Sequence, residues 1–346
     1  MANLRLVVTG ASGFIGSRLA LHAHRAGIDV LAAGRVETPV EIERAEELRA
    51  AGVPFSAGTL QDREYLRSVL AHRSSMIHLA AAQHESHMPA EYFRAVNVQG
   101  TRALLETARE AGVRRFVYGS SIGIYGESVE GLLNEQSPPR PENIYTETKL
   151  AAEAVVNEFS KDLETCIVRI SETYGPSDYR LLKLFRAIDR GHFVMLGSGA
   201  NRRQCMHVND LIRVLLLAVQ HPRAVGETFV VAGRETMTTN EMVHAIATAM
   251  GCRLPRLHLP LWPFNAAAFV METVLPPLGI QPPLHRRRLD FFSKSFVFST
   301  DKVETALGFQ SEIDFLSGAA DTARWYRARG LLSARVPHAV AETESI

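Results

Sequence analysis

The sequence predicts an α/β protein: a doubly wound parallel Rossmann sheet with a smaller C-terminal substrate lobe. In the first half of the chain, short apolar runs alternate with helical patterns, which is typical of a parallel sheet covered by helices. A glycine triplet, Gly10, Gly13 and Gly16, follows directly after the first apolar run. The length of 346 residues suits two domains, or one domain with an elaborated lobe.

Seven strands are expected, each a short apolar run bounded by glycine, proline or polar residues. They cover residues 5–9, 29–33, 54–57, 75–80, 115–119, 165–169 and 228–231. The helices between them are recognised by apolar residues three and four positions apart. They are expected at residues 14–26, 40–51, 63–72, 97–111, 145–161 and 210–220. Right-handed β-α-β units of this kind place a ligand crevice at the carboxyl ends of the strands.

The domain organisation follows from where this alternation stops. The NAD(P)-binding Rossmann domain is expected to span residues 1–170, with returning segments at about 207–232. Glycine and proline punctuate short elements in residues 171–206 and 233–330, which we assign to the substrate-binding lobe. Residues 331–346 are polar and aperiodic, so a disordered tail is expected there.

Composition argues against several classes of function. The chain is 46% hydrophobic and 22% charged, with a net charge of +1, which is typical of a soluble globular protein rather than one that binds nucleic acid or an anionic membrane. Its three cysteines lie far apart without metal-ligand spacing, so neither a metal site nor a disulfide framework is expected. The apolar stretch at 261–280 is interrupted by prolines and a glutamate, which argues against a membrane span. We expect a cytoplasmic homodimer with a small-molecule substrate.

The glycine triplet has the spacing and position of a dinucleotide-binding turn. Glycines there permit a tight turn, a close approach of the backbone to a pyrophosphate, and close packing of the next helix on the strand. The N-terminus of that helix offers free N–H groups to the phosphates. An ordinary turn is the alternative, and the strand-turn-helix context disfavours it.

The end of the second strand bears on the choice of cofactor. In NAD-binding proteins this position carries an acid that holds the ribose hydroxyls. Here the sequence reads Gly34-Arg35, and an arginine would pair with the 2′-phosphate of NADP. The alternative is a surface arginine paired with Glu37 and Glu41. The sequence favours NADP, with NAD as the alternative cofactor.

Tyr145 and Lys149 place a phenol and an ammonium on the same face of a predicted helix. The free phenol has a pKa near 10, and a neighbouring cation lowers it toward neutral pH. Ser121, at the end of the fifth strand, can donate a hydrogen bond to a substrate oxygen. Together they suit proton exchange with a hydroxyl or carbonyl while hydride moves to or from a nicotinamide. A chance pair at this spacing is common, but the predicted dinucleotide fold favours a catalytic site.

The sequence resembles the extended short-chain dehydrogenase/reductase superfamily, in its NAD-dependent epimerase/dehydratase group. The resemblance extends from residue 1 to about residue 330, in the order of motifs that the family shows. The matching segments are 10–16, 78–81, 97–101, 116–121, 124–126, Tyr145 with Lys149, 169–176, 203–210 and 307–309.

The resemblance implies a role for each matching position. Ser121, Tyr145 and Lys149 would be catalytic, with Lys149 also holding the nicotinamide ribose, and Asn97 would support the sheet end and a water. The cofactor would contact Gly10, Ser12, Gly13, Phe14, Ile15, Gly16, Arg35, Leu60, Leu79, Ala80, Ala81, Asn97, Tyr145, Lys149 and Tyr174. The substrate would contact Ser121, Glu172, Arg203 and His84, and Arg203 aligns with an arginine that binds the diphosphate of nucleotide sugars.

Two positions depart from the family's pattern. Thr59 stands where many members carry an adenine-contacting aspartate, and Glu172 stands where sugar-nucleotide epimerases carry asparagine. A carboxylate that faces a diphosphate is costly unless it is paired.

These observations leave three functions open. The first is an NAD(P)-dependent oxidoreductase or epimerase acting on a hydroxyl/carbonyl pair of a nucleotide sugar. The alternative is an NADPH-dependent ketone reductase or hydroxysteroid-type dehydrogenase, which Glu172, Arg35 and the apolar segment from Leu261 favour. A non-enzymatic NADP sensor is the third, and the intact catalytic set argues against it.

Overall fold

In a computed structural model the chain forms two compact units. The structure describes residues 4–83, 88–126, 131–254, 257–275, 280, 284 and 289–333. The first unit consists of Met1–Thr173, Val208–Gly233 and Phe298–Glu312, and the second of Tyr174–His207, Arg234–Val297 and Ile313–Ile346.

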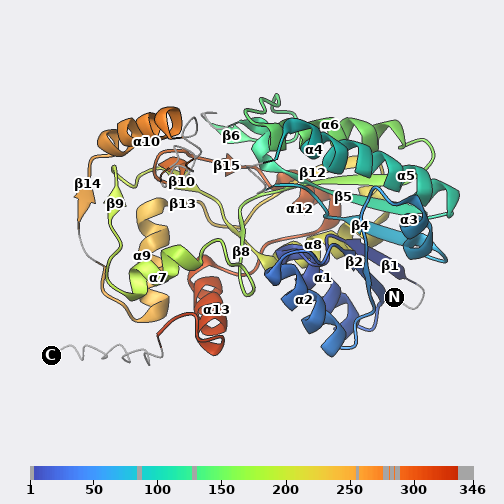
Figure 1. The fold of residues 1–346 in the computed structure, drawn as a ribbon, viewed down its shortest axis with the longest axis horizontal. Helices are drawn as coiled ribbons and strands as arrows, with labels where there is room; N and C mark the ends of the chain where they lie inside the picture. The colour runs from blue at the N-terminus through green and yellow to red at the C-terminus, as the bar shows by residue number, and fades with distance from the viewer. Residues whose placement is uncertain are drawn as a thin grey trace. The chain divides into compact units, whose positions relative to one another are not determined.

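A seven-stranded sheet forms the centre of the first unit, with the order β12-β7-β5-β4-β1-β2-β3 (Figure 1). Each neighbouring pair is parallel. The chain moves outward from β1 to β3 and then returns to the other side of β1, so the crevice lies where β1 and β4 end. This confirms the predicted doubly wound fold. The strands are β1 (Arg5–Thr9), β2 (Asp29–Gly34), β3 (Phe55–Ala57), β4 (Ser75–His78), β5 (Arg115–Ser121), β7 (Glu164–Ile170) and β12 (Glu227–Val231).

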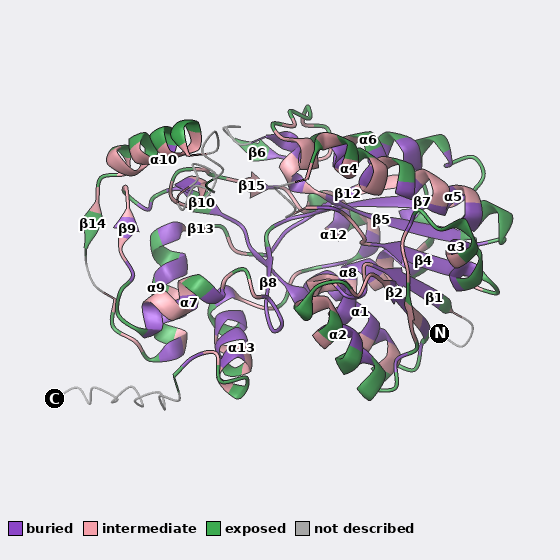
Figure 2. Ribbon diagram, in the orientation of Figure 1, coloured by how far each residue is buried: buried purple, intermediate pink, exposed green. Residues whose placement is uncertain are grey.

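Helices cover both faces of this sheet, and the strands between them are buried (Figure 2). On one face lie α1 (Phe14–Arg25), α2 (Pro39–Ala50) and α8 (Val208–Gln220). On the other lie α3 (Arg63–Leu70), α4 (Ala90–Arg94), α5 (Gly100–Glu110) and α6 (Ile144–Glu158). The apolar side chains of α3, α5 and α6 pack with those of the strands in one core cluster.

The helix predicted at 97–111 is not a regular α-helix at its start. Residues Ala95–Gln99 form a π-helical turn, η1, and α5 begins only at Gly100. The wider turn carries Asn97, whose buried side chain bonds to groups outside the helix. The apolar periodicity that predicted the helix carries no information on this bulge.

Residues 298–312 belong to the first unit, whereas their glycine- and proline-punctuated surroundings had predicted that they lie in the substrate lobe. Here α12 (Asp301–Leu307) packs beside β12. Lys302 Nζ donates to the carbonyl of Thr228 at 2.8 Å and pairs with Glu227 at 2.8 Å. This segment returns to the sheet edge from far along the chain, which a local pattern does not reveal.

The second unit is built on α7 (Leu182–Asp189), α9 (Thr239–Met250) and α13 (Phe315–Ala328), which share one apolar core. Short strand pairs join β10 (Arg202–Arg203) to β13 (Met237–Thr238), and β9 (Met195–Leu196) to β14 (His258–Leu259). The predicted start of the disordered tail, at residue 331, is wrong. Leu332 is buried, and Ser333 N donates to Asp189 Oδ2 at 3.1 Å. The rest of that predicted tail lies outside the described residues.

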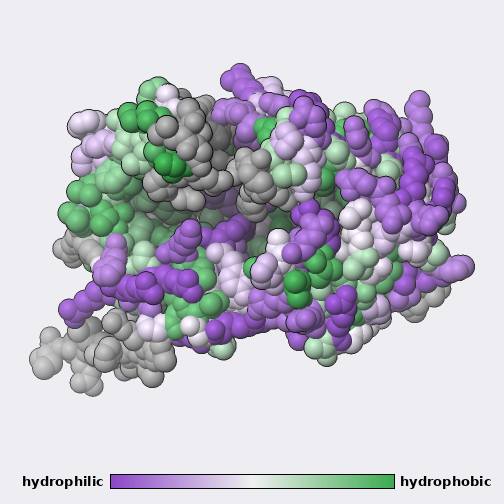
Figure 3. Space-filling view, in the orientation of Figure 1, coloured by the Kyte–Doolittle hydropathy of each residue, from purple (hydrophilic) through white to green (hydrophobic). Residues whose placement is uncertain are grey.

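Helix α10 (Trp262–Val274) of the second unit carries apolar side chains at the surface (Figure 3). Trp262 is 72% exposed, and Phe269, Val270 and Val274 are also exposed. At 13 residues the helix is too short to span a bilayer, and the described part of the chain contains no helix both long and apolar enough to do so.

Candidate active site

The turn between β1 and α1 has the shape that a dinucleotide requires. Gly10 has φ of +70°, and a Cβ on it would lie 2.6 Å from the backbone nitrogen of Ala80. A side chain on Gly16 would overlap the Gly10 carbonyl. Helix α1 then begins at Phe14, with Gly13 at its N-cap, so the N–H groups of its first turn face the end of the sheet. These residues fit the pyrophosphate of NAD or NADP.

A cavity of about 680 Å³ in the first unit opens beside this turn. Eight predicted cofactor contacts line it: Gly10, Ser12, Gly13, Arg35, Leu60, Leu79, Ala80 and Ala81. Phe14, Ile15 and Gly16 lie in the first turn of α1. Sequence reasoning missed Tyr65, Met88, Tyr92 and Val96 as cavity residues, because their side chains reach it from α3, from α4 and from the residues around α4 without any motif.

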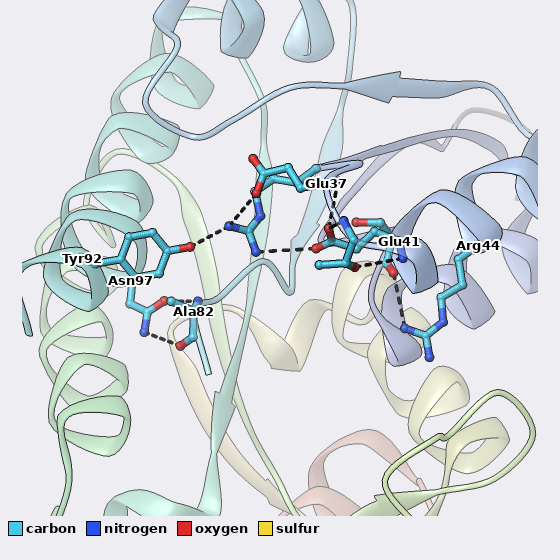
Figure 4. Close-up of polar contacts among 9 residues, drawn as sticks. Glu37, Glu41, Arg44, Ala82, Tyr92 and Asn97 are labelled. Atoms are coloured by element: carbon cyan, nitrogen blue, oxygen red, sulfur yellow. Dashed lines mark hydrogen bonds and ion pairs between the residues drawn. The ribbon is translucent and has the colours of Figure 1, made fainter. Parts of the chain in front are cut away.

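Arg35 lines this cavity and contacts Tyr92, Glu37 and Glu41, which Figure 4 labels. Its Nη1 donates to the hydroxyl of Tyr92 at 2.6 Å. The carboxylates of Glu37 and Glu41 each lie 3.5 Å from the guanidinium. The two carboxylates compensate the charge of Arg35, which disfavours its use for a 2′-phosphate.

Glu41 is held in this position by the start of α2. Its Oε2 accepts from the backbone nitrogens of Glu37 at 3.1 Å and of Thr38 at 2.9 Å. Thr38 Oγ1 accepts in return from Glu41 N at 3.2 Å, which completes a capping box. The carboxylate beside Arg35 is therefore fixed by the helix itself.

Asn97 connects the end of β4 to α6. Its Oδ1 accepts from Ala82 N at 2.7 Å, and its Nδ2 donates to Ala82 O at 3.0 Å and to Thr148 Oγ1 at 2.9 Å (Figure 4 shows the pair with Ala82). These bonds engage both ends of the amide, so the geometry supports the expected role at the sheet end. The expected contact of Asn97 with a water stays a prediction.

The structure brings together the elements that carry Ser121, Tyr145 and Lys149. Lys149 is 2% exposed, and its Nζ donates to the carbonyl of Gly119 at 2.6 Å, two residues before Ser121. Ser121 Oγ accepts from Gly123 N at 3.1 Å in the turn that follows β5. That turn lies against the first turn of α6, because a Cβ on Gly123 would be 2.9 Å from Thr146 Cγ2.

Helix α6 begins at Ile144, immediately before Tyr145. Asn143 caps it, since its Oδ1 accepts from Thr146 N at 3.1 Å and Thr146 Oγ1 lies 3.3 Å from Asn143 N. Tyr145 is partly exposed in this first turn, whereas Lys149, one turn later, is buried. The two residues are one turn apart on the same helix, and they differ in exposure.

The buried surroundings of Lys149 favour the deprotonated form of its side chain. Burial lowers the pKa of the Lys149 ammonium to about 7, against the opposing effect of Glu153. The Nζ also lies 4.1 Å from the centre of the Tyr118 ring. Burial, and then the charge of Lys149, lower the pKa of His78 to about 3, so this histidine is neutral. It bonds to Thr9 and Thr101 within the core.

The remaining predicted contacts are placed as follows. Glu172 is exposed just after β7. Arg203 and Tyr174 belong to the second unit: Arg203 donates to Phe291 O at 3.0 Å with its guanidinium over that ring, and the Tyr174 side chain is in the apolar core. His84 lies outside the described residues, and the roles of all four stay predictions.

Comparison with known proteins identifies the family of the chain. The profile of the NAD dependent epimerase/dehydratase family matches residues 6–232, from β1 to the end of the sheet. The chain belongs to the NAD-dependent epimerase/dehydratase family. It is an enzyme of the extended short-chain dehydrogenase/reductase superfamily, and NAD is the cofactor by which its family is named.

Members of this family resemble the chain over most of its length. It is 28% identical to dTDP-glucose 4,6-dehydratase of Streptomyces niveus, covering 94% of this chain and 93% of that protein. It is 27% identical to UDP-glucose 4-epimerase of Vibrio cholerae, covering 74% and 79%. The crystal structure of DesIV, a dTDP-glucose 4,6-dehydratase from Streptomyces venezuelae with NAD and TYD bound, superposes with a TM-score of 0.76 at 26% identity, covering 95% and 99%.

Proposed function

We propose that this epimerase/dehydratase family member oxidises a hydroxyl of a nucleotide-linked sugar with NAD, as the first step of a 4-epimerisation or 4,6-dehydration. One observation carries the proposal. Buried Lys149 donates to β5 just before Ser121, from the same helix that presents Tyr145. This joins an acid–base phenol, a supporting cation and a hydroxyl at one sheet edge.

The residues divide the chemistry among them. Tyr145 takes the proton of the substrate hydroxyl, and Ser121 donates a hydrogen bond to the same oxygen. Lys149, when protonated, stabilises the phenolate and holds the nicotinamide ribose. Among the described residues, Lys149 Nζ donates one hydrogen bond, to Gly119, so two of its three N–H groups remain for these contacts. NAD bound along the glycine turn would supply the hydride acceptor.

A nucleotide sugar is the substrate class that the relatives support. The dehydratase and the epimerase named above both act on a glucose attached to a nucleoside diphosphate, as their names state. Arg203 is the residue that we assign to the diphosphate, on the second unit. The apolar ketone or steroid that the sequence left open has no comparable support.

NAD, rather than the NADP that the sequence favours, is the cofactor that we propose. Tyr92, Glu37 and Glu41 already engage Arg35, so its charge is compensated before any cofactor arrives. The family's dependence on NAD and the NAD bound in DesIV agree with this.

The proposal is tested by incubating the enzyme and NAD with UDP-glucose, dTDP-glucose, a steroid alcohol and a small secondary alcohol. Mass spectrometry and NMR of the products separate epimerisation, which leaves the mass unchanged, from dehydration, which removes one water. We expect turnover with at least one nucleotide sugar. Turnover confined to the steroid or the small alcohol would contradict the proposal.

A further inference from the structure

We propose that Glu153 is a positioning residue which, in competition with Arg169, sets the charge state of Lys149. The inference rests on the proposed function only for what the Lys149 ammonium does in the reaction. It concerns a buried ion pair behind the catalytic helix, away from the cofactor cavity.

The ion pair joins α6 to the neighbouring strand β7. Glu153 is one helical turn after Lys149, so the two side chains lie on the same face of α6. Arg169 Nε donates to Glu153 Oε1 at 3.1 Å, and Arg169 Nη2 donates to Glu153 Oε2 at 2.8 Å. Both side chains are buried, at 5% and 11% exposed, so solvent screens their charges little.

Arg169 also holds the turn that follows the catalytic strand. Its Nη1 donates to Tyr125 Oη at 2.7 Å and to the carbonyl of Glu135 at 3.0 Å. Tyr125 ends the short helix that begins after Ser121. The bridge therefore ties the helix of Tyr145 and Lys149 to the segment of Ser121.

The titratable groups around Lys149 come from four elements. Its own helix supplies Glu153 and Tyr145, β4 supplies neutral His78, β5 supplies Tyr118, and β7 supplies Arg169 behind Glu153. Among the described residues, Glu153 is the carboxylate whose charge opposes the effect of burial on the pKa of Lys149. The same carboxylate forms the buried ion pair with Arg169.

This arrangement predicts opposite effects for the two halves of the bridge. Glu153→Gln removes the anion and leaves Arg169 uncompensated, so Lys149 loses its proton at lower pH. Arg169→Gln leaves the whole carboxylate charge for Lys149, so the ammonium persists to higher pH. A bridge with a purely structural role would give both variants the same change, since both lose the same contact.

Titration of Lys149 by NMR measures this directly. The chain has five lysines, so a ¹³Cε-lysine-labelled sample gives few resonances, and Lys149→Met identifies the one of interest. We expect its midpoint to move down by about one pH unit or more in Glu153→Gln and to move up in Arg169→Gln. Glu153→Asp keeps the charge and should restore a midpoint close to that of the wild type.

Glu164→Gln is the matched control. Glu164 accepts from buried Arg115 at 3.0 and 2.9 Å across the other ends of β5 and β7, far along the strands from Lys149. Its loss removes another ion pair between β5 and β7, although a more exposed one, and should leave the pH midpoint of Lys149 unchanged. If Glu153→Gln does not fold, the double variant Glu153→Gln/Arg169→Gln removes both buried charges, and it should still move the midpoint down.

Midpoints that do not move, or that move in the same direction in Glu153→Gln and Arg169→Gln, would overturn the proposal. The titration uses the protein without cofactor or substrate, so its failure is distinct from failure of the proposed reaction. As a second readout, the alkaline loss of NAD affinity should move to lower pH in Glu153→Gln.

Discussion

At the scale of single residues, Lys149 occupies a position that disfavours its own charge. Burial holds the folded-state pKa of this ammonium at about 7, below the ordinary 10.5, so the unfolded chain binds more protons between those pH values. The stability cost of Lys149 is therefore full below pH 7 and disappears as the pH rises toward 10.5. We expect Lys149→Met to exceed the wild type in free energy of unfolding by at least about 1 kcal/mol at pH 6. Urea unfolding at pH 6 and pH 9.5 should show this advantage shrinking with pH, and a constant difference would contradict the assignment.

The corner around Arg35 makes a second residue-scale prediction. NAD should bind more tightly than NADP, and Glu41→Gln should raise the NADP affinity by about tenfold, because one of two carboxylates near the 2′ position loses its charge. Glu46→Gln is the control, since Glu46 is an exposed acid on the same helix that does not line the cavity. Calorimetric titration of both cofactors measures this. NADP bound more tightly by the wild type would restore the preference that the sequence indicated.

At the scale of elements, the start of α6 matters because the phenol stands in its first turn. Asn143→Ala should cost about 1 kcal/mol of stability and also lower turnover, since the frayed turn carries Tyr145. Asp314→Ala removes the cap of α13 in the second unit and should cost similar stability with turnover unchanged. Urea unfolding and initial rates on both variants check this. Equal turnover in the two variants would contradict a role for the cap in positioning Tyr145.

Some elements of the fold have local signals in the sequence, and others do not. The short apolar runs and the glycine turn predicted all seven strands, because buried parallel strands and the β1–α1 turn have strong local requirements. The π-helical turn at Asn97 and the association of α12 with β12 could not be predicted, since both depend on partners distant in sequence. For the same reason Tyr92 was missed beside Arg35, and so was the pairing of Glu153 with Arg169 on the neighbouring strand.

At the scale of the whole molecule, the family match ends where the sheet ends, at residue 232. The cavity beside the glycine turn and the proposed catalytic residues belong to the first unit, whereas Arg203 belongs to the second. Specificity for the nucleotide part of the substrate is therefore expected to depend on the second unit. Arg203→Gln should raise the KM for a nucleotide sugar by more than about tenfold and leave NAD affinity unchanged. Steady-state kinetics measure the KM, and calorimetry measures the NAD affinity. An unchanged KM would contradict the assignment of Arg203 to the diphosphate.

The role that we propose for Tyr145 is to exchange the proton of the substrate hydroxyl. Its test is single-turnover conversion of the active nucleotide sugar by Tyr145→Phe, which keeps the ring and removes the hydroxyl. We predict a loss of about 10²- to 10⁴-fold in rate, with NAD affinity within a few-fold of the wild type because Lys149 remains. A Tyr145→Phe enzyme that converts the sugar within a few-fold of the wild-type rate would contradict the account.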